Sequence, residues 1–248
     1  MRKIYYTLTA LTLSLTSCND LLDRMPDNRL VIDSPEKVQQ ALTNAYPQIA
    51  TTLINEFSSD NIDDIGADNI YSNFLTRETA YWQPILEYNN VDGLQNIWDY
   101  HYKAIGQANA ALDAIETTLH NDASLNPAKG EALVARAYAH FCLVNLFSQA
   151  YNPNTSSSDL GIPYITRPEE EMNPQRQRGT VAEVYQQIAA DLEKGLPLID
   201  DSYYQMPKYH FNKKAAYAFA ARFYLYYQQW QKALDAANVV LTTNDATT

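Results

Sequence analysis

The sequence predicts an all-α fold built from tetratricopeptide-like helical pairs joined by long irregular loops. Apolar residues recur every three or four positions through most of the chain, as one buried face of a helix requires. No stretch alternates convincingly between apolar and polar residues with the period of two that a half-buried strand has. The last two helical patterns are separated by a short turn and carry aromatic and small residues near the positions of a tetratricopeptide unit.

The amino-terminal residues 1–17 predict a lipoprotein signal peptide. Two basic residues precede a moderately apolar run, 4–15, that is too short to span the roughly 30 Å core of a bilayer as a helix. The run ends in Leu15-Thr16-Ser17-Cys18, which resembles a bacterial lipobox. We therefore expect Cys18 to be lipidated and to become the first residue of the mature chain. An ordinary secretory signal with a chance cysteine is the alternative.

The residues that follow Cys18 predict a tether and then a helical domain. Residues 18–33 are polar and lack periodicity, so we expect an extended tether ahead of a domain that comprises 34–248. Ser34 and Pro35 are typical of a helix start, because Ser caps the first turn and Pro fits there. Pro47 should end or kink this first helix.

Three long helices are expected in the middle of the chain. Residues 94–119 place apolar side chains at steps of three and four, which predicts a stripe for packing against another helix. Residues 131–149 are apolar on most sides and should form a central helix. Thr180 and Glu183 form a capping-box pattern at the start of the third helix. The intervening segments 58–90 and 151–179 are expected to be long loops.

We expect the apolar faces of the last pair of helices, 216–227 and 233–241, to be buried by an additional segment of the protein. Between residues 215 and 227 only Arg222 is charged, so the first helix of the pair is apolar or aromatic on every face. An end unit of a helical array normally turns a polar face outward. We therefore expect an amino-terminal part of a longer protein, with the carboxy-terminal half absent. That half would pack on Phe219, Phe223 and Tyr226.

The charge balance argues against nucleic acid as a partner. The chain of 248 residues has 18 Lys+Arg against 29 Asp+Glu, which gives a formal net charge of -11. A negative field of this size repels phosphate backbones. We therefore expect no nucleic acid partner.

No motif predicts an enzyme, a metal site or a cofactor. The four histidines lack the spacing of a metal site, and His101 and His140 lie on apolar helical patterns, so we interpret these two as structural. With only 7 Gly and no glycine-rich motif, a phosphate-binding loop is not expected. The acidic loop that contains Asp60, Asp63 and Asp64 fails the calcium-loop pattern, and we interpret it as solvated.

A polar loop rich in aromatic residues is the one positive signal for a ligand. Flat rings suit sugars, because the C–H faces of a pyranose pack on them while hydroxyl groups form hydrogen bonds at the rim. The alternative is that the rings fold back onto the helical core. The candidate glycan-binding residues are Tyr71, Tyr81, Trp82, Asn89 and Asn90.

Several short patterns, taken in order, resemble the SusD/RagB family of outer-membrane nutrient-binding lipoproteins. The resemblance runs from the signal peptide to the end of the chain. The patterns are the lipobox with Cys18-Asn19-Asp20-Leu21-Leu22-Asp23 and Pro26, the helix from Trp98 to Leu119 with Ala108-Asn109, Glu131-Ala132, Arg136-Ala137-Tyr138 with Phe141, and Gly161-Ile162-Pro163-Tyr164.

This resemblance implies a function at the cell surface. Members of the family are α-helical, tetratricopeptide-like proteins that bind glycans, or in some branches peptides. They sit on a SusC-like TonB-dependent transporter in the outer membrane. The resemblance implies that this chain is a surface-exposed lipoprotein anchored through Cys18, which binds an oligosaccharide and passes it to such a transporter. The chain departs from the family in length, since members are about twice as long.

Two other functions remain open on the sequence. The first is a tetratricopeptide-type adaptor lipoprotein that binds protein partners through its concave face. The second is a glycan-processing enzyme, because carboxylate pairs are spaced in three dimensions and leave no sequence motif.

Overall fold

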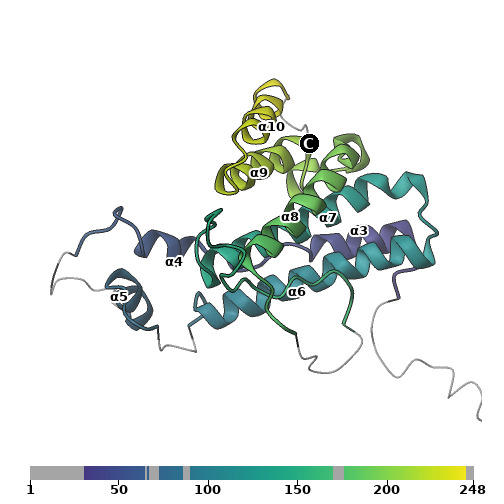
Figure 1. The fold of residues 1–248 in the computed structure, drawn as a ribbon. Coiled ribbons are helices and arrows are strands. Elements are labelled where there is room, and N and C mark those ends of the chain that lie inside the picture. Colours follow the sequence, from purple (N-terminus) through teal and green to yellow (C-terminus); the bar gives the residue numbers. More distant parts are fainter. Residues whose placement is uncertain (1–30, 65, 67–72, 86–89, 170–175, 244–248) are drawn as a thin grey trace, which may run out of the picture. The chain divides into compact units, whose positions relative to one another are not determined.

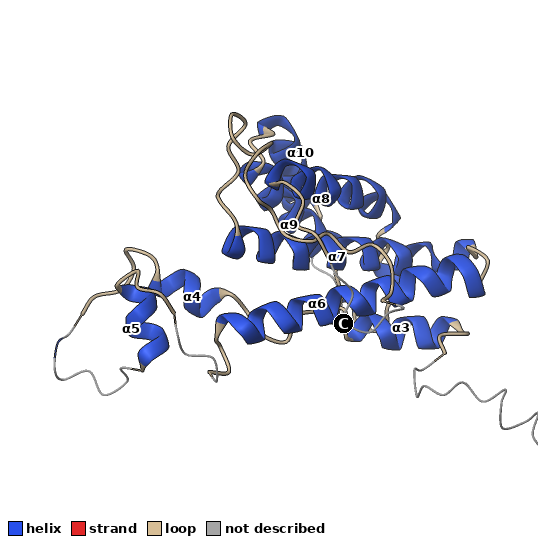
Figure 2. Cartoon of the chain, turned by 60° about the horizontal axis from the view of Figure 1, so that its bottom comes forward, coloured by secondary structure: helices blue, strands red, loops and turns tan. Residues whose placement is uncertain are grey.

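The computed structural model describes residues 31–64, 66, 73–85, 90–169 and 176–243. The chain divides into an amino-terminal unit, Met1–Val31, and a helical unit, Ile32–Thr248. The predicted signal peptide, Cys18 and nearly all of the predicted tether lie outside the described residues. Within the described part of the helical unit the regular structure is helical, with one isolated bridge between Leu160 and Thr180 (Figure 2). The all-α prediction is confirmed.

Three long helices form the centre of the helical unit. Helix α7 (Asn126–Phe147) packs against α6 (Leu94–Asp113) on one side and α8 (Val181–Gly195) on the other (Figure 1). Helix α7 is buried along most of its length, as its apolar sequence predicts. The predicted capping box at Thr180 and Glu183 is present at the start of α8.

Small residues allow α7 and α8 to approach closely. A Cβ atom added to Gly130 of α7 would lie 2.8 Å from the carbonyl oxygen of Gly195, and one added to Gly195 would lie 2.9 Å from that of Gly130. Any side chain here would therefore force the two backbones apart. The contact fixes the separation of the central helices.

The first described helix, α3 (Pro35–Thr43), begins and ends as its sequence predicts. The Ser34 hydroxyl accepts a hydrogen bond from the Lys37 amide, Pro35 occupies the first turn, and the helix ends before Pro47. Its apolar face, which includes Val38 and Leu42, packs on α6 and α7. Helix α6 continues through a π-helical turn, Ala114–Thr118, so the predicted helix to Leu119 is confirmed.

Sequence analysis predicts a loop at 58–90, but one short helix lies within this segment and another lies just before it. They are α4 (Thr52–Phe57) and α5 (Phe74–Ala80). A capping box between Asn73 and Thr76 starts α5. Both helices pack on a small hydrophobic cluster of their own, which also receives side chains from α6 and α7. The buried members of this cluster are Ile49, Ile54, Leu75 and Ile97, and Leu146 and Phe147 pack against them.

The carboxy-terminal pair of described helices, α9 (Lys213–Tyr226) and α10 (Trp230–Thr242), packs together as the tetratricopeptide-like pattern predicts. The expectation that Phe219 and Phe223 await cover is wrong. Both rings are buried against Phe141 of α7, at centroid distances of 5.6 and 6.0 Å. The large apolar side chains of this pair that remain exposed are Leu225, Tyr226, Trp230, Leu234 and Leu241.

Short 3₁₀ turns connect the longer helices, and they are Ala123–Leu125, Leu196–Leu198, Asp201–Tyr203 and Pro207–Tyr209. None of the described helices is long and apolar enough to cross a membrane.

Candidate functional site

The predicted ring residues Tyr81 and Trp82 lie at the carboxyl end of α5. Tyr81 follows the last residue of the helix, and Trp82 has a φ of 54°, in the left-handed region that turns the chain away from the helix axis. Their side chains are 55% and 79% exposed, so neither ring folds back onto the helical core. Phe74, at the other end of α5, is also exposed, and the Arg77 guanidinium lies 5.1 Å from the centroid of its ring.

A carboxylate orients the Tyr81 ring. The Tyr81 hydroxyl donates a hydrogen bond to the Asp64 carboxylate, which also accepts one from the Gly66 amide at 2.7 Å. The bond to Tyr81 lowers the pKa of Asp64, and the same bond raises the pKa of Tyr81. Part of the acidic loop therefore holds an exposed ring in place.

The other predicted site residues have different positions. Tyr71 and Asn89 lie outside the described residues. Asn90 begins the turn before α6, where its side-chain oxygen accepts a hydrogen bond from the Asp92 amide at 3.0 Å and its backbone carbonyl accepts one from Asn96 at 2.9 Å. The Asn90 side-chain oxygen thus already has a local partner in the turn.

A buried ion pair lies at the centre of the three long helices. Arg136 of α7 donates two hydrogen bonds to Asp191 of α8, with N···O distances of 2.7 and 2.6 Å, and both side chains are only 8% exposed. The remaining nitrogen, Nη1, donates to the side-chain oxygen of Asn109 at 2.8 Å and to the carbonyl of Thr166 at 3.1 Å. A planar guanidinium suits this forked geometry.

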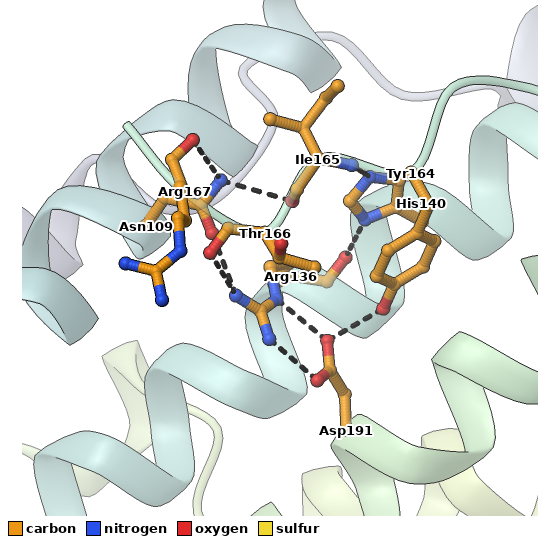
Figure 3. Close-up of polar contacts among 8 residues, drawn as sticks. All are labelled: Asn109, Arg136, His140, Tyr164, Ile165, Thr166, Arg167 and Asp191. Carbon is orange, nitrogen blue, oxygen red and sulfur yellow. Dashed lines mark hydrogen bonds and ion pairs between the residues drawn. The ribbon is translucent and has the colours of Figure 1, made fainter. Parts of the chain in front are cut away.

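This ion pair and its neighbours attach the segment 160–167 to the helices (Figure 3). The Asn109 amide donates to the carbonyls of Ile165 and Arg167, at 3.1 and 3.3 Å. The Tyr164 hydroxyl donates to Asp191 at 2.6 Å. Burial raises the pKa of Tyr164 well above its ordinary value, so the hydroxyl stays protonated as a donor. The network therefore holds a segment without regular structure against α6, α7 and α8.

His140 has a structural role in the same network. Its Nδ1 lies 2.9 Å from the carbonyl of Arg136, and its Nε2 accepts a hydrogen bond from the Ile165 amide at 3.1 Å, so the neutral ring with hydrogen on Nδ1 satisfies both partners. The Tyr164 ring stacks on it at a centroid distance of 3.8 Å. Burial lowers the pKa of His140 to about 3. The structural interpretation of this histidine fits these contacts.

A second buried carboxylate, Glu131 of α7, joins the segment after α3 to the segment before α9. Its Oε1 accepts hydrogen bonds from the Tyr46 hydroxyl at 2.5 Å and from His210 Nδ1 at 2.8 Å. The Tyr46 hydroxyl in turn accepts one from the Phe211 amide at 2.7 Å. Burial, followed by the Glu131 charge, raises the pKa of Tyr46, which keeps its hydroxyl protonated.

The residues behind the sequence resemblance therefore fall mainly in the buried framework. Sequence analysis missed Asp191, although it lies among the apolar residues Ile188 and Leu192 of a predicted helix, where a charge needs a buried partner. In the part of the chain that the structure describes, no three His, Cys, Asp or Glu side chains are grouped to hold a metal ion.

Comparison with known proteins agrees with the fold. The model of a SusD-like family, described as starch-binding and associating with the outer membrane, matches residues 20–225. A SusD-like protein P2 from Formosa agariphila is 25% identical over 259 residues, which cover 97% of this chain and 46% of that protein.

Solved structures of SusD-like proteins have a similar fold. A SusD superfamily protein from Bacteroides thetaiotaomicron is 25% identical and has a TM-score of 0.65, covering 84% of this chain and 46% of the other. A putative sugar binding protein from Bacteroides vulgatus has a TM-score of 0.67 at 23% identity, and the match covers 86% of this chain and 47% of the other. A laminarin binding SusD-like protein has a TM-score of 0.63 at 19% identity, and the match covers 85% of this chain and 44% of the other. The chain spans about half the length of these relatives.

Proposed function

This chain belongs to the SusD-like family, and on that premise we propose that it binds oligosaccharides through the exposed rings of Tyr81 and Trp82. The observation that carries the proposal is the exposure of these rings at the end of a helix whose other face is anchored by Leu75. An exposed aromatic ring loses apolar hydration when a pyranose covers it. The hydrogen bond from Tyr81 to Asp64 reduces the freedom that the ring would lose on binding.

Two buried carboxylates, Asp191 and Glu131, have no part in the proposed sugar binding. Asp191 is ion-paired with Arg136, and Glu131 accepts hydrogen bonds from Tyr46 and His210. A glycosidase needs two carboxyl groups that face the scissile bond across a cleft. Asp191 and Glu131 are committed to the framework instead, so we assign them no part in sugar chemistry.

The cellular setting belongs to the same proposal. The family is described as associating with the outer membrane. We propose that diacylglycerol on Cys18 anchors the chain there, facing outward, since lipid chains hold a protein at a membrane without a spanning helix. Delivery of the bound oligosaccharide to a SusC-like TonB-dependent transporter completes the proposed role.

One observation favours the adaptor as a second candidate. A groove of about 280 Å³ lies between the end of α3 and the side of α6, and polar side chains line most of it. Amide and ammonium groups of this kind can bind the backbone of a partner peptide. The polar residues of this groove are Asn44, Gln48, Lys103 and Gln107.

The test compares two pairs of ring substitutions. Tyr81→Ala with Trp82→Ala should weaken oligosaccharide binding by about 1–3 kcal/mol, the scale of two ring contacts, with little change in melting temperature. The matched control is Tyr209→Ala with Trp230→Ala, because these side chains are 71% and 61% exposed on another part of the unit. Equal affinity of the two double variants would contradict the proposal, and binding of peptides in place of glycans would favour the adaptor.

A further inference from the structure

The exposed side of α5 carries a further aromatic ring, Phe74, on the same face as Tyr81. The two residues are seven positions apart, which is close to two full turns and a rise of about 10 Å along the helix. Tyr81 keeps this register although it follows the last residue of α5, because its amide donates to the Arg77 carbonyl at 3.0 Å. The Phe74 side chain is 62% exposed, and the Tyr81 side chain is 55% exposed. Two accessible rings therefore lie along one line of the helix surface.

A different side of α5 is anchored, and this fixes the direction of the face that carries the rings. Leu75 and Thr79 are the buried residues of the helix, and Leu75 belongs to the hydrophobic cluster that also contains Ile54. Neither buried residue lies on the line that joins Phe74 to Tyr81. The packing of α5 through Leu75 therefore turns the two rings outward.

Arg77 lies between the two rings. It is three positions after Phe74 and four before Tyr81, so it shares their face of the helix. Its guanidinium lies 5.1 Å from the centroid of the Phe74 ring. The hydrogen bond to Asp64 raises the pKa of Tyr81, and the positive charge of Arg77 opposes part of this rise. Within the described part of the chain the guanidinium donates no hydrogen bond and forms no ion pair, so its N–H groups are available to a ligand.

We propose that Phe74, Arg77 and Tyr81 form one track along α5, which binds an oligosaccharide of at least three sugar units. One unit covers each ring, and the unit between them accepts hydrogen bonds from Arg77. The rings are about 10 Å apart along the helix, so a single pyranose cannot reach from one to the other. The planar guanidinium offers several donors in fixed directions, which suits the hydroxyl groups of the middle unit. This inference rests on the proposed function, and it adds a further contact ring and the minimum length of the ligand.

The test measures how affinity depends on the length of the sugar. Calorimetry gives dissociation constants for two series, maltose to maltohexaose and laminaribiose to laminarihexaose. In a series that binds, the affinity of the wild type should rise about tenfold from the disaccharide to the tetrasaccharide, because only the longer ligand reaches both rings.

Phe74→Leu is the central variant, because it keeps an apolar side chain and removes the flat ring. It should weaken hexasaccharide binding about threefold to tenfold and change disaccharide affinity less than about twofold, with an unchanged melting temperature. Phe74→Tyr restores a flat ring and should bind the hexasaccharide as the wild type does. Tyr209→Leu is the matched control, since Tyr209 is 71% exposed in the turn Pro207–Tyr209, and it should also bind as the wild type does.

The results that overturn the inference differ from the result that overturns the proposed function. If Phe74→Leu binds the hexasaccharide like the wild type while the Tyr81 and Trp82 double variant does not, α5 is not a track and the proposed function stands. If Phe74→Tyr binds as weakly as Phe74→Leu, the ring of Phe74 is not the contact. If the disaccharide binds the wild type as tightly as the hexasaccharide does, the minimum length is wrong. If neither series binds to the wild type, the proposed function and the track fail together.

Discussion

Replacement of Asp191 by Ala should expose how far the fold depends on its buried ion pair. The Arg136 guanidinium would lose its counter-ion at a position where both side chains are only 8% exposed, and the Tyr164 hydroxyl would lose its acceptor. Breaking a buried pair by removing one partner costs about 3–5 kcal/mol. The lost Tyr164 bond adds about 1 kcal/mol, and the better helix propensity of Ala within α8 offsets about half of that. We therefore expect the free energy of unfolding to fall by about 3.5–5.5 kcal/mol.

Urea unfolding at pH 7, followed by far-ultraviolet circular dichroism, measures this loss. For a domain of this size the midpoint should fall by about 1.5–2 M at an unchanged slope. Asp191→Asn keeps one oxygen that can accept from Tyr164, but it removes the charge and one of the two acceptors of Arg136, so its stability should lie between those of the wild type and Asp191→Ala. Asp235→Ala on α10 controls for loss of an exposed carboxylate and should change stability by less than about 0.5 kcal/mol. A loss below about 1 kcal/mol for Asp191→Ala would refute the reasoning.

The other predictions concern packing, pH and anchoring. Gly130→Ala should cost about 1–3 kcal/mol because its Cβ would lie 2.8 Å from Gly195, whereas Gly106→Ala, with open space around its Cβ, should gain up to about 1 kcal/mol in the same unfolding assay. Burial lowers the pKa of His140 to about 3, so its stabilising effect is complete above the ordinary pKa near 6.5 and is lost as the pH falls from there toward 3. The free energy of unfolding, measured at several pH values, should therefore depend less steeply on pH for His140→Gln than for the wild type. An equal dependence on pH would contradict this. Cys18→Ala should abolish incorporation of labelled fatty acid and release the chain from the outer membrane, and unchanged labelling would exclude lipidation at Cys18.

Strong helical patterns could be predicted from the sequence, because burial of a long stripe repeats over many residues. Helix α7 is the clearest case, since its apolar composition alone predicts a central position. Helix α5 has only seven residues and buries only Leu75 and Thr79, so its periodicity is too brief to detect. The Asn73 and Thr76 capping pair was the available signal.

The buried network could be predicted only in part. Asn109, Arg136 and Tyr164 stand out in the sequence as parts of recognisable patterns, but their convergence depends on how α6, α7 and the segment 160–167 pack. Asp191 carries no local signal beyond a charge among apolar residues. The sequence predicts that the rings of Phe219 and Phe223 are buried, but it does not show which segment buries them. In the structure Phe141 of α7 packs against both rings.

The central claim, that oligosaccharides bind at the end of α5, is tested most directly by the fluorescence of Trp82 itself. The chain has 3 Trp, so Trp98→Phe with Trp230→Phe leaves Trp82 as the single reporter. Trp82 is 79% exposed and should emit as a solvated indole. Titration with the oligosaccharide that binds best by calorimetry should shift its emission to shorter wavelength, with the same dissociation constant as the calorimetric titration. Calorimetric binding that leaves the emission of Trp82 unchanged would contradict the claim.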